Sequence, residues 1–192
     1  MKIKLLLVLL CLGQFVIGQT KNEKEERIKL SNFPLAAQQV VTSLPSDCKR
    51  LKFYKETDGQ KESFEAKFKY KGKRYSLEFS KEGNIEDLEV LTKIKSIEAT
   101  ISSKIIEHFE STYTKHKLIK IQEQYVYNTA TDPIQFVKRV LNQKSDIAPN
   151  FEIIAEVKLN KQRELRELTF DSTGQFLNFR TVNPSSYEHV LY

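Results

Sequence analysis

Cysteine, tryptophan and histidine are scarce in this sequence. The 192 residues include two cysteines, three histidines, six glycines and no tryptophan. Cys11 lies in an apolar run at the start of the chain, and if that run is removed only Cys48 remains. A single cysteine cannot close an internal disulfide, so the protein must be stabilised by a packed core, for which its length is sufficient.

The sequence also contains few of the motifs that support catalysis. The glycines are scattered and form no phosphate-binding loop, and no Gly-x-Ser-x-Gly motif occurs. His108 and His116 are too far apart in sequence to lie on adjacent helical turns as a metal pair does. We therefore expect no catalytic residue, no metal, no cofactor and no enzyme activity. A hydrolase that uses Cys48 is a less favoured alternative, because no base stands near it in the sequence.

The amino terminus has the features of a secretory signal peptide. Lys2 and Lys4 precede an apolar run from Leu5 to Ile17, which Gly18 follows. The run is shorter than the roughly 20 residues of a membrane span. We expect export to the periplasm or the medium and no membrane span after cleavage. An uncleaved anchor and lipidation at Cys11 are the alternatives.

The formal net charge is +6, and acidic and basic residues are interspersed along the chain. Nucleic-acid-binding proteins typically have an arginine-rich block or a pattern of aromatic and basic residues, and the sequence contains neither. We therefore expect no nucleic-acid partner.

The clearest structural pattern runs from Phe64 to Val90 and predicts an antiparallel meander. Apolar and charged residues alternate before Gly72 and again after it, as in strands that bury one face. Gly72 and Gly83 mark hairpin turns because glycine tolerates positive φ. Leu88 belongs to a third strand.

Helical patterns precede this meander and a second one. Apolar residues recur at helical spacing from Phe33 to Leu44 and from Ile97 to Tyr113. Asp132 is typical of a helix start before Pro133, which predicts an inserted helix at about 132–143.

The two meanders resemble each other in sequence. Leu77–Ile85 aligns without a gap to Leu168–Phe176. The predicted fold class is α+β, a tandem repeat of a helix plus a four-stranded antiparallel meander sheet, with helices on one face and the other face open. The expected divisions are a signal peptide at 1–18, a charged disordered lead at 19–32, a first repeat at 33–94, a second repeat at 95–183 that contains the inserted helix, and a tail at 184–192.

Tyr75–Ile85 and Leu165–Phe176, each with a Phe-(Ser/Asp)-x-x-Gly turn, resemble the PepSY-like, beta-lactamase-inhibitor-like (BLIP-like) proteins of Bacteroidetes. The resemblance implies a secreted or periplasmic, non-enzymatic module whose relatives are linked by fold similarity to the inhibition of hydrolases or proteases. The chain departs from the family pattern in having no tryptophan and in its longer segment from Thr129 to Pro149.

The open sheet face is the candidate binding surface, because aromatic residues and arginine are enriched at interface hot spots. An ordinary solvated face is the alternative. Ile85 and Phe176 fall out of step with their strands, so either a bulge turns them inward or each lies on the open face. The residues expected to bind a partner are Tyr54, Lys67, Lys69, Arg74, Ile154, Lys158, Phe176 and Arg180.

Two functions remain open from the sequence. The first is a non-catalytic binding module, possibly inhibitor-like, that holds a protein or a cell-envelope component on the open face. The second is a structural or accessory envelope protein that acts by assembly with other subunits through its edge strands.

Overall fold

The computed structural model describes residues 20–142 and 146–183, in which ten strands form one sheet. The strands are β1 (Thr20–Lys21), β2 (Glu23–Ile28), β3 (Lys49–Asp58), β4 (Lys61–Tyr70), β5 (Lys73–Ser80), β6 (Ile85–Leu91), β7 (Lys115–Val126), β8 (Asn150–Leu159), β9 (Gln162–Phe170) and β10 (Phe176–Val182). Their order is β1-β10-β9-β8-β7-β6-β5-β4-β3-β2, so β3 to β10 form one uninterrupted antiparallel meander.

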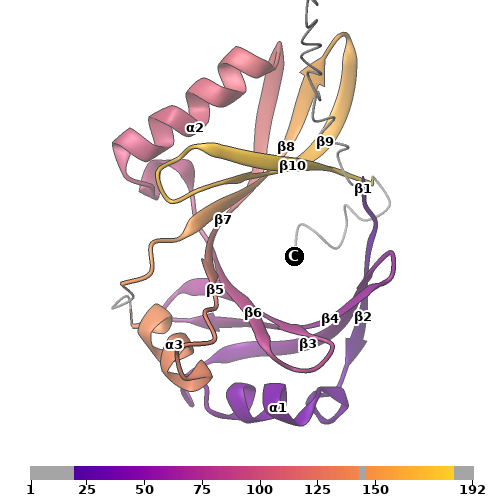
Figure 1. The fold of residues 1–192 in the computed structure, drawn as a ribbon, viewed down its shortest axis with the longest axis vertical. Helices are drawn as coiled ribbons and strands as arrows, with labels where there is room; N and C mark the ends of the chain where they lie inside the picture. The colour runs from indigo at the N-terminus through magenta and orange to yellow at the C-terminus, as the bar shows by residue number, and fades with distance from the viewer. Residues whose placement is uncertain (1–19, 143–145, 184–192) are drawn as a thin grey trace, which may run out of the picture.

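The first two strands nearly close the sheet on itself. β1 pairs in parallel with β10, and β2 pairs in antiparallel fashion with β3. Only Asn22 separates β1 from β2, so one short segment contacts both ends of the meander. Figure 1 shows the resulting ring of strands, with β1 and β2 joining its upper and lower halves. We call this junction, residues 20–28 with β3 and β10, the seam.

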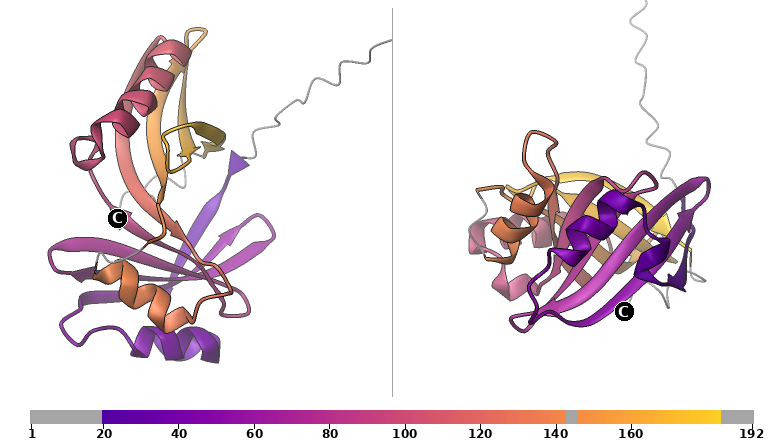
Figure 2. Two further views of the ribbon diagram at one scale, coloured as in Figure 1. Left: turned by 60° about the vertical axis from the view of Figure 1, so that its left-hand side comes forward. Right: turned by 90° about the horizontal axis from the view of Figure 1, so that it is seen from below.

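Three helices lie on the outer side of the curved sheet: α1 (Leu35–Thr42), α2 (Ala99–Thr112) and α3 (Pro133–Leu141) (Figures 1 and 2). Short 3-10 helices span Leu30–Asn32 and Ile94–Ser96. The main apolar cores are on this outer side. One joins α1 and α3 to β3–β6 around Phe79 and Phe136, and the other joins α2 to β7–β9 around Phe109 and Phe170.

The local sequence explains the helices. The Asp132 side chain accepts a hydrogen bond of 2.9 Å from the Gln135 N–H, and Pro133 occupies the first turn of α3, where it needs no donor. Ile105 and Phe109 give α2 its buried stripe. The three predicted helices and the meander from Phe64 to Val90 are therefore confirmed within one or two residues at most ends.

The predicted fold class is wrong. The two expected sheets are one, because β6 pairs with β7 from Asp87–Val126 to Leu91–Gln122, across the expected boundary between repeats. The face expected to be open lines the inside of the ring. Alternation of apolar and polar residues determines which side chains share a face, but the curvature comes from strand twist and bulges, which the alternation does not encode.

The expected disordered lead is also different, because residues 20–28 of it form β1 and β2. Glu23 and Glu25 face a polar interior, so this strand has no apolar alternation from which it could have been predicted. The predicted signal peptide and C-terminal tail lie outside the described residues. Within the described ranges, no helix is long and apolar enough to cross a membrane.

Bulges account for the two residues that were out of step. Phe79 lies opposite Ile85 and Glu78 lies opposite Asp87, so Glu86 is the extra residue. A corresponding shift separates Phe176 from Asn178 in β10. Ile85 and Phe176 consequently pack on the outer, apolar side of the sheet.

Candidate functional site

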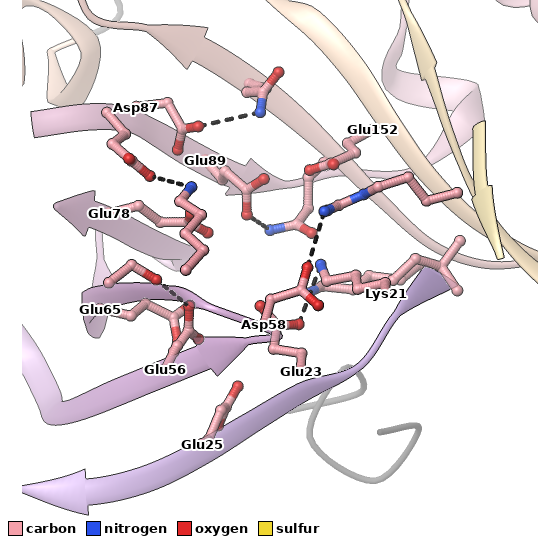
Figure 3. A pocket seen from close by; sticks show the side chains of 18 of the residues that line it. Lys21, Glu23, Glu25, Glu56, Asp58, Glu65, Glu78, Asp87, Glu89 and Glu152 are labelled. Atoms are coloured by element: carbon pink, nitrogen blue, oxygen red, sulfur yellow. Dashed lines mark hydrogen bonds and ion pairs between the residues drawn. The ribbon is translucent and has the colours of Figure 1, made fainter. Parts of the chain in front are cut away.

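The inside of the ring encloses a polar cavity of about 160 Å³ (Figure 3). Carboxylates outnumber cationic side chains along its wall by ten to five, although the chain as a whole carries a formal charge of +6. The acidic residues are Glu23, Glu25, Glu56, Asp58, Glu65, Glu78, Glu86, Asp87, Glu89 and Glu152. The basic residues are Lys21, Lys61, Lys67, Lys120 and Arg180. The interior therefore has the opposite sign of formal charge from the whole protein.

Strand register places several of these carboxylates directly opposite one another. Glu25 faces Glu56 across β2 and β3, and Glu65, Glu78 and Asp87 form a row across β4, β5 and β6. Like charges in directly opposed positions destabilise a sheet. Burial and the neighbouring carboxylates raise the pKa of Glu56 and of Glu78 well above its usual range.

One group of carboxylates has its own cation. Glu25, Glu56 and Glu65 each place an oxygen within 4.8 Å of the others. Lys67 Nζ lies 2.6 Å from Glu25 Oε1 and 2.9 Å from Glu65 Oε2. Burial disfavours the charged amine, but the carboxylates of Glu65 and Glu25 outweigh burial and raise the pKa of Lys67. This group is held together by internal ion pairs.

A second group joins the strands at the seam. Glu167 accepts from Lys21 Nζ at 2.7 Å and from Arg180 at 2.6 Å, and Arg180 also reaches Asp58 on β3 at 3.2 Å. The Asn22 N–H donates to Asp58 at 2.9 Å. Burial opposes the ionisation of Glu167, but Lys21 and Arg180 outweigh it and lower the pKa of Glu167 to about 2.

The third group consists of Glu78, Asp87 and Glu89, whose carboxylate oxygens also lie within 4.8 Å of one another. Amides hold two of these side chains: Gln124 Nε2 donates to Asp87 Oδ2 at 3.1 Å, and Gln122 Nε2 donates to Glu89. Burial, with the charges of Glu152 and Glu86, raises the pKa of Asp87 to about 7. Across the described ranges 20–142 and 146–183, no cationic side chain forms an ion pair with this group.

A basic groove adjoins the cavity. Its cationic residues are Arg50, Lys52, Lys67, Lys69, Arg74 and Lys120. Arg50 has a φ of +59° at an irregularity in the β3–β4 pairing, and it lowers the pKa of Lys69 together with Arg74. The cavity and the groove thus present opposite charges on one continuous side of the sheet.

Four of the sequence-predicted residues lie at or beside the cavity. Lys67, Ile154 and Arg180 line it, and Lys67 also stands over the Tyr54 ring at 4.9 Å. Ile154 is buried with Val182, away from solvent. These residues are thus part of an enclosed wall instead of an open face.

The other four predicted residues are dispersed. Lys69, which is half-buried, and Arg74, which is exposed, lie opposite one another in the basic groove. Lys158 pairs with Lys115 at the far end of β8. Phe176 lies on the outer side of the sheet, stacked on His108 at 4.3 Å between ring centroids. Their role in binding a partner stays a prediction.

Sequence reasoning missed the acids that give the cavity its character. Asp87 and Glu89 alternate with the buried Leu88 and Val90, and Glu152 alternates with the buried Ile153 in the same way. Such alternation is typical of a strand with one polar face, but the sequence analysis did not single out these acids, and no sequence signal indicates that this face is enclosed.

No family model and no curated protein matches this chain. Among solved structures, a DUF2874 family protein of Bacteroides ovatus has a TM-score of 0.51 at 9% identity, covering 78% of this chain and 87% of its own. A candidate periplasmic protein of Bacteroides eggerthii has the same TM-score and identity, covering 78% of this chain and 88% of its own. These likenesses show a shared fold.

A third structure, described as a candidate calcium-regulated periplasmic protein of Bacteroides thetaiotaomicron, has a TM-score of 0.30 at 21% identity, covering 81% of this chain and 95% of its own. That TM-score supports no conclusion about this chain. None of these descriptions names a PepSY-like or BLIP-like protein. The description of the Bacteroides eggerthii protein as periplasmic agrees with the export predicted from the amino terminus.

Proposed function

We propose that this chain is an exported, non-catalytic binding protein that holds a small positively charged ligand inside its sheet. The observation that carries the proposal is the excess of carboxylates over cations, ten to five, in the wall of the cavity of a protein with a formal charge of +6. Enclosed walls of one charge concentrate counter-ions and strengthen their electrostatic attraction.

The size of the cavity decides which class of ligand it accepts. At about 160 Å³ it accommodates an ion with its water or a small amine, but not a segment of a folded protein. An inhibitor-like contact with a protein, which the family resemblance suggested, would have to be made on the outside of the ring.

The test is a thermal-shift series with calcium, magnesium and spermidine, each compared with choline chloride at equal ionic strength. A ligand that binds only the folded state at about 100 times its dissociation constant stabilises the protein by about 2.7 kcal/mol. We expect at least one of the three cations to raise the melting temperature beyond the choline control.

A matched pair of variants locates the effect. Glu89→Gln removes a carboxylate from the cavity, and Glu110→Gln removes an exposed one from α2. The stabilisation by the cation should shrink in Glu89→Gln and persist in Glu110→Gln. If no cation stabilises the protein more than choline does, the proposal is wrong.

A second candidate function rests on the basic groove. Arg50, Lys69 and Arg74 lie close together there, and within the described ranges none of them forms an ion pair, which favours an acidic partner such as an acidic protein surface. Salt-dependent retention on immobilised poly-glutamate should fall in a Lys69→Gln/Arg74→Gln variant. A role as an accessory envelope subunit instead requires stable assembly, which light scattering measures.

A further inference from the structure

The carboxylates of Glu78, Asp87 and Glu89 have the separation of ligands around one ion. One oxygen from each lies within 4.8 Å of the others. Calcium binds oxygen at about 2.3–2.6 Å, so oxygens on opposite sides of one ion are separated by about 5 Å. The three residues come from the neighbouring strands β5 and β6, and Glu152 of β8 stands beside Glu89 (Figure 3).

One oxygen of these three carboxylates is buried and has no hydrogen-bond partner among the described residues. Asp87 is only 9% exposed, and its Oδ2 accepts from Gln124, whereas its Oδ1 accepts no hydrogen bond from residues 20–142 and 146–183. Figure 3 shows the Asp87 carboxylate directed into the cavity. Buried carboxylate oxygens are normally satisfied by a donor or a metal ion, because an unpaired one costs free energy.

The other carboxylate group of the cavity provides the contrast. In the group of Glu25, Glu56 and Glu65, Lys67 contacts both Glu25 and Glu65 and offsets part of the negative charge of the group. Glu78, Asp87, Glu89 and Glu152 receive no such contact from any lysine, arginine or histidine in the part of the chain that the structure describes. Amides are the donors that the described residues supply to Asp87 and Glu89, so a cation that balances this group would come from outside the protein chain.

We propose that Glu78, Asp87 and Glu89, assisted by Glu152, bind one divalent metal ion, with calcium as the best match. This inference rests on the proposed function and specifies its ligand. All the donors are oxygens, which favours hard cations over zinc or copper. Carboxylates on adjacent strands give an irregular arrangement, which calcium tolerates better than magnesium, since magnesium requires a near-ideal octahedron.

The experiment is isothermal titration of calcium into the purified protein after treatment with a chelator. We expect one calcium ion per chain in the wild type. Asp87→Asn should weaken calcium binding at least about tenfold, as losses at metal sites commonly do. The loss should exceed that in Glu56→Gln, which removes a carboxylate from the group already paired with Lys67. Glu110→Gln on the outer helix should bind as the wild type does.

Stability in chelator shows whether the variants are folded. Asp87→Asn removes a charge that lies directly opposite the like charge of Glu78. Because such a pair destabilises a sheet, the melting temperature of this variant without metal should be no lower than that of the wild type. Should it fail to fold, Glu78→Gln is the second variant, with the same expected loss of calcium binding.

Three results would overturn the inference. They are no calcium binding to the wild type, wild-type affinity in both Asp87→Asn and Glu78→Gln, and an equal loss in Glu56→Gln. If spermidine still stabilises the protein while calcium does not bind, the metal site is wrong and the proposed function stands. If calcium, magnesium and spermidine all fail to act, both are wrong.

Discussion

Buried carboxylates in this protein have three electrostatic environments. Glu65 is paired with Lys67, Glu167 is paired with both Lys21 and Arg180, and Asp87 has no cation in contact in the part of the chain that the structure describes. Removing a charge from water is costly unless a partner compensates for it. A buried carboxylate therefore stabilises the fold at one position and opposes it at another.

Glu167 should make the protein sensitive to acid. Its folded pKa of about 2 lies below the usual value of 4.5, so the folded state favours the ionised form. The resulting stabilisation is complete above about pH 4.5 and is lost as the pH falls towards 2. At most it amounts to about 3 kcal/mol, since one pKa unit corresponds to about 1.4 kcal/mol.

Urea denaturation of the wild type and of Glu167→Gln from pH 7 to pH 2 measures this effect. The wild type should have the larger free energy of unfolding at pH 7, and the difference should shrink by up to about 3 kcal/mol at pH 2. A difference that does not depend on pH would show that the Glu167 charge does not contribute in this way.

At the scale of elements, two hairpin turns are packed against helices. The turn between β5 and β6 contains Gly83, where an added Cβ would lie 2.7 Å from Pro34 Cβ at the start of α1. The turn between β9 and β10 contains Gly174, where an added Cβ would lie 2.7 Å from the Ile101 carbonyl oxygen of α2. Each turn thus helps to position a helix on the outer side.

Alanine at these glycines should therefore destabilise the fold more than alanine at Gly72. All three glycines have positive φ, but Gly72 has open space around its Cα. Gly72→Ala should cost about 1 kcal/mol through backbone strain alone, whereas Gly83→Ala and Gly174→Ala should cost roughly 2–4 kcal/mol. Urea denaturation measures these costs, and equal losses at all three positions would contradict the packing argument.

The elements with an apolar period were the predictable part of this fold. The three strands between Phe64 and Val90 could be predicted because each of them buries one face against the outer helices, which produces an alternating pattern of apolar residues. β2 was not predictable, since Glu23 and Glu25 face the polar cavity and the strand has no apolar stripe. Which face of the sheet is enclosed depends on twist and on the bulge at Glu86, and no local pattern encodes these.

The candidate site was predictable to a smaller extent. The alternation correctly placed Glu65, Lys67 and Glu78 on one face. It did not reveal that Glu152 approaches Glu89 from another part of the chain, because this proximity depends on β7 lying between β6 and β8. Contacts between strands distant in sequence arise from the pairing order of the whole sheet.

At the scale of the whole molecule, the ring depends on a short seam. Among the described residues, β1 pairs with β10 through two residue pairs, Thr20–Thr181 and Lys21–Val182. A two-residue strand contributes few hydrogen bonds, so the ion pairs of Lys21 with Glu167 and of Arg180 with Asp58 must supply much of the closure. The outer cores around Phe79 and Phe109 are built mainly from the other strands and the helices, and Ile28 of β2 and Phe179 of β10 pack at their edges.

Lys21→Met should therefore open the seam without unfolding the cores. It keeps the apolar stem of the side chain but leaves Glu167 with Arg180 alone, and breaking a buried pair costs roughly 3–5 kcal/mol. We expect amide hydrogen exchange in β1, β2 and β10 to increase at least about tenfold, with β4 to β8 little changed.

Lys55→Met is the control, because the Lys55–Glu62 pair has side chains 35% and 49% exposed and such surface pairs contribute little. Faster exchange throughout the sheet would mean that Lys21 stabilises the whole fold, and unchanged exchange at the seam would mean that backbone pairing alone closes the ring.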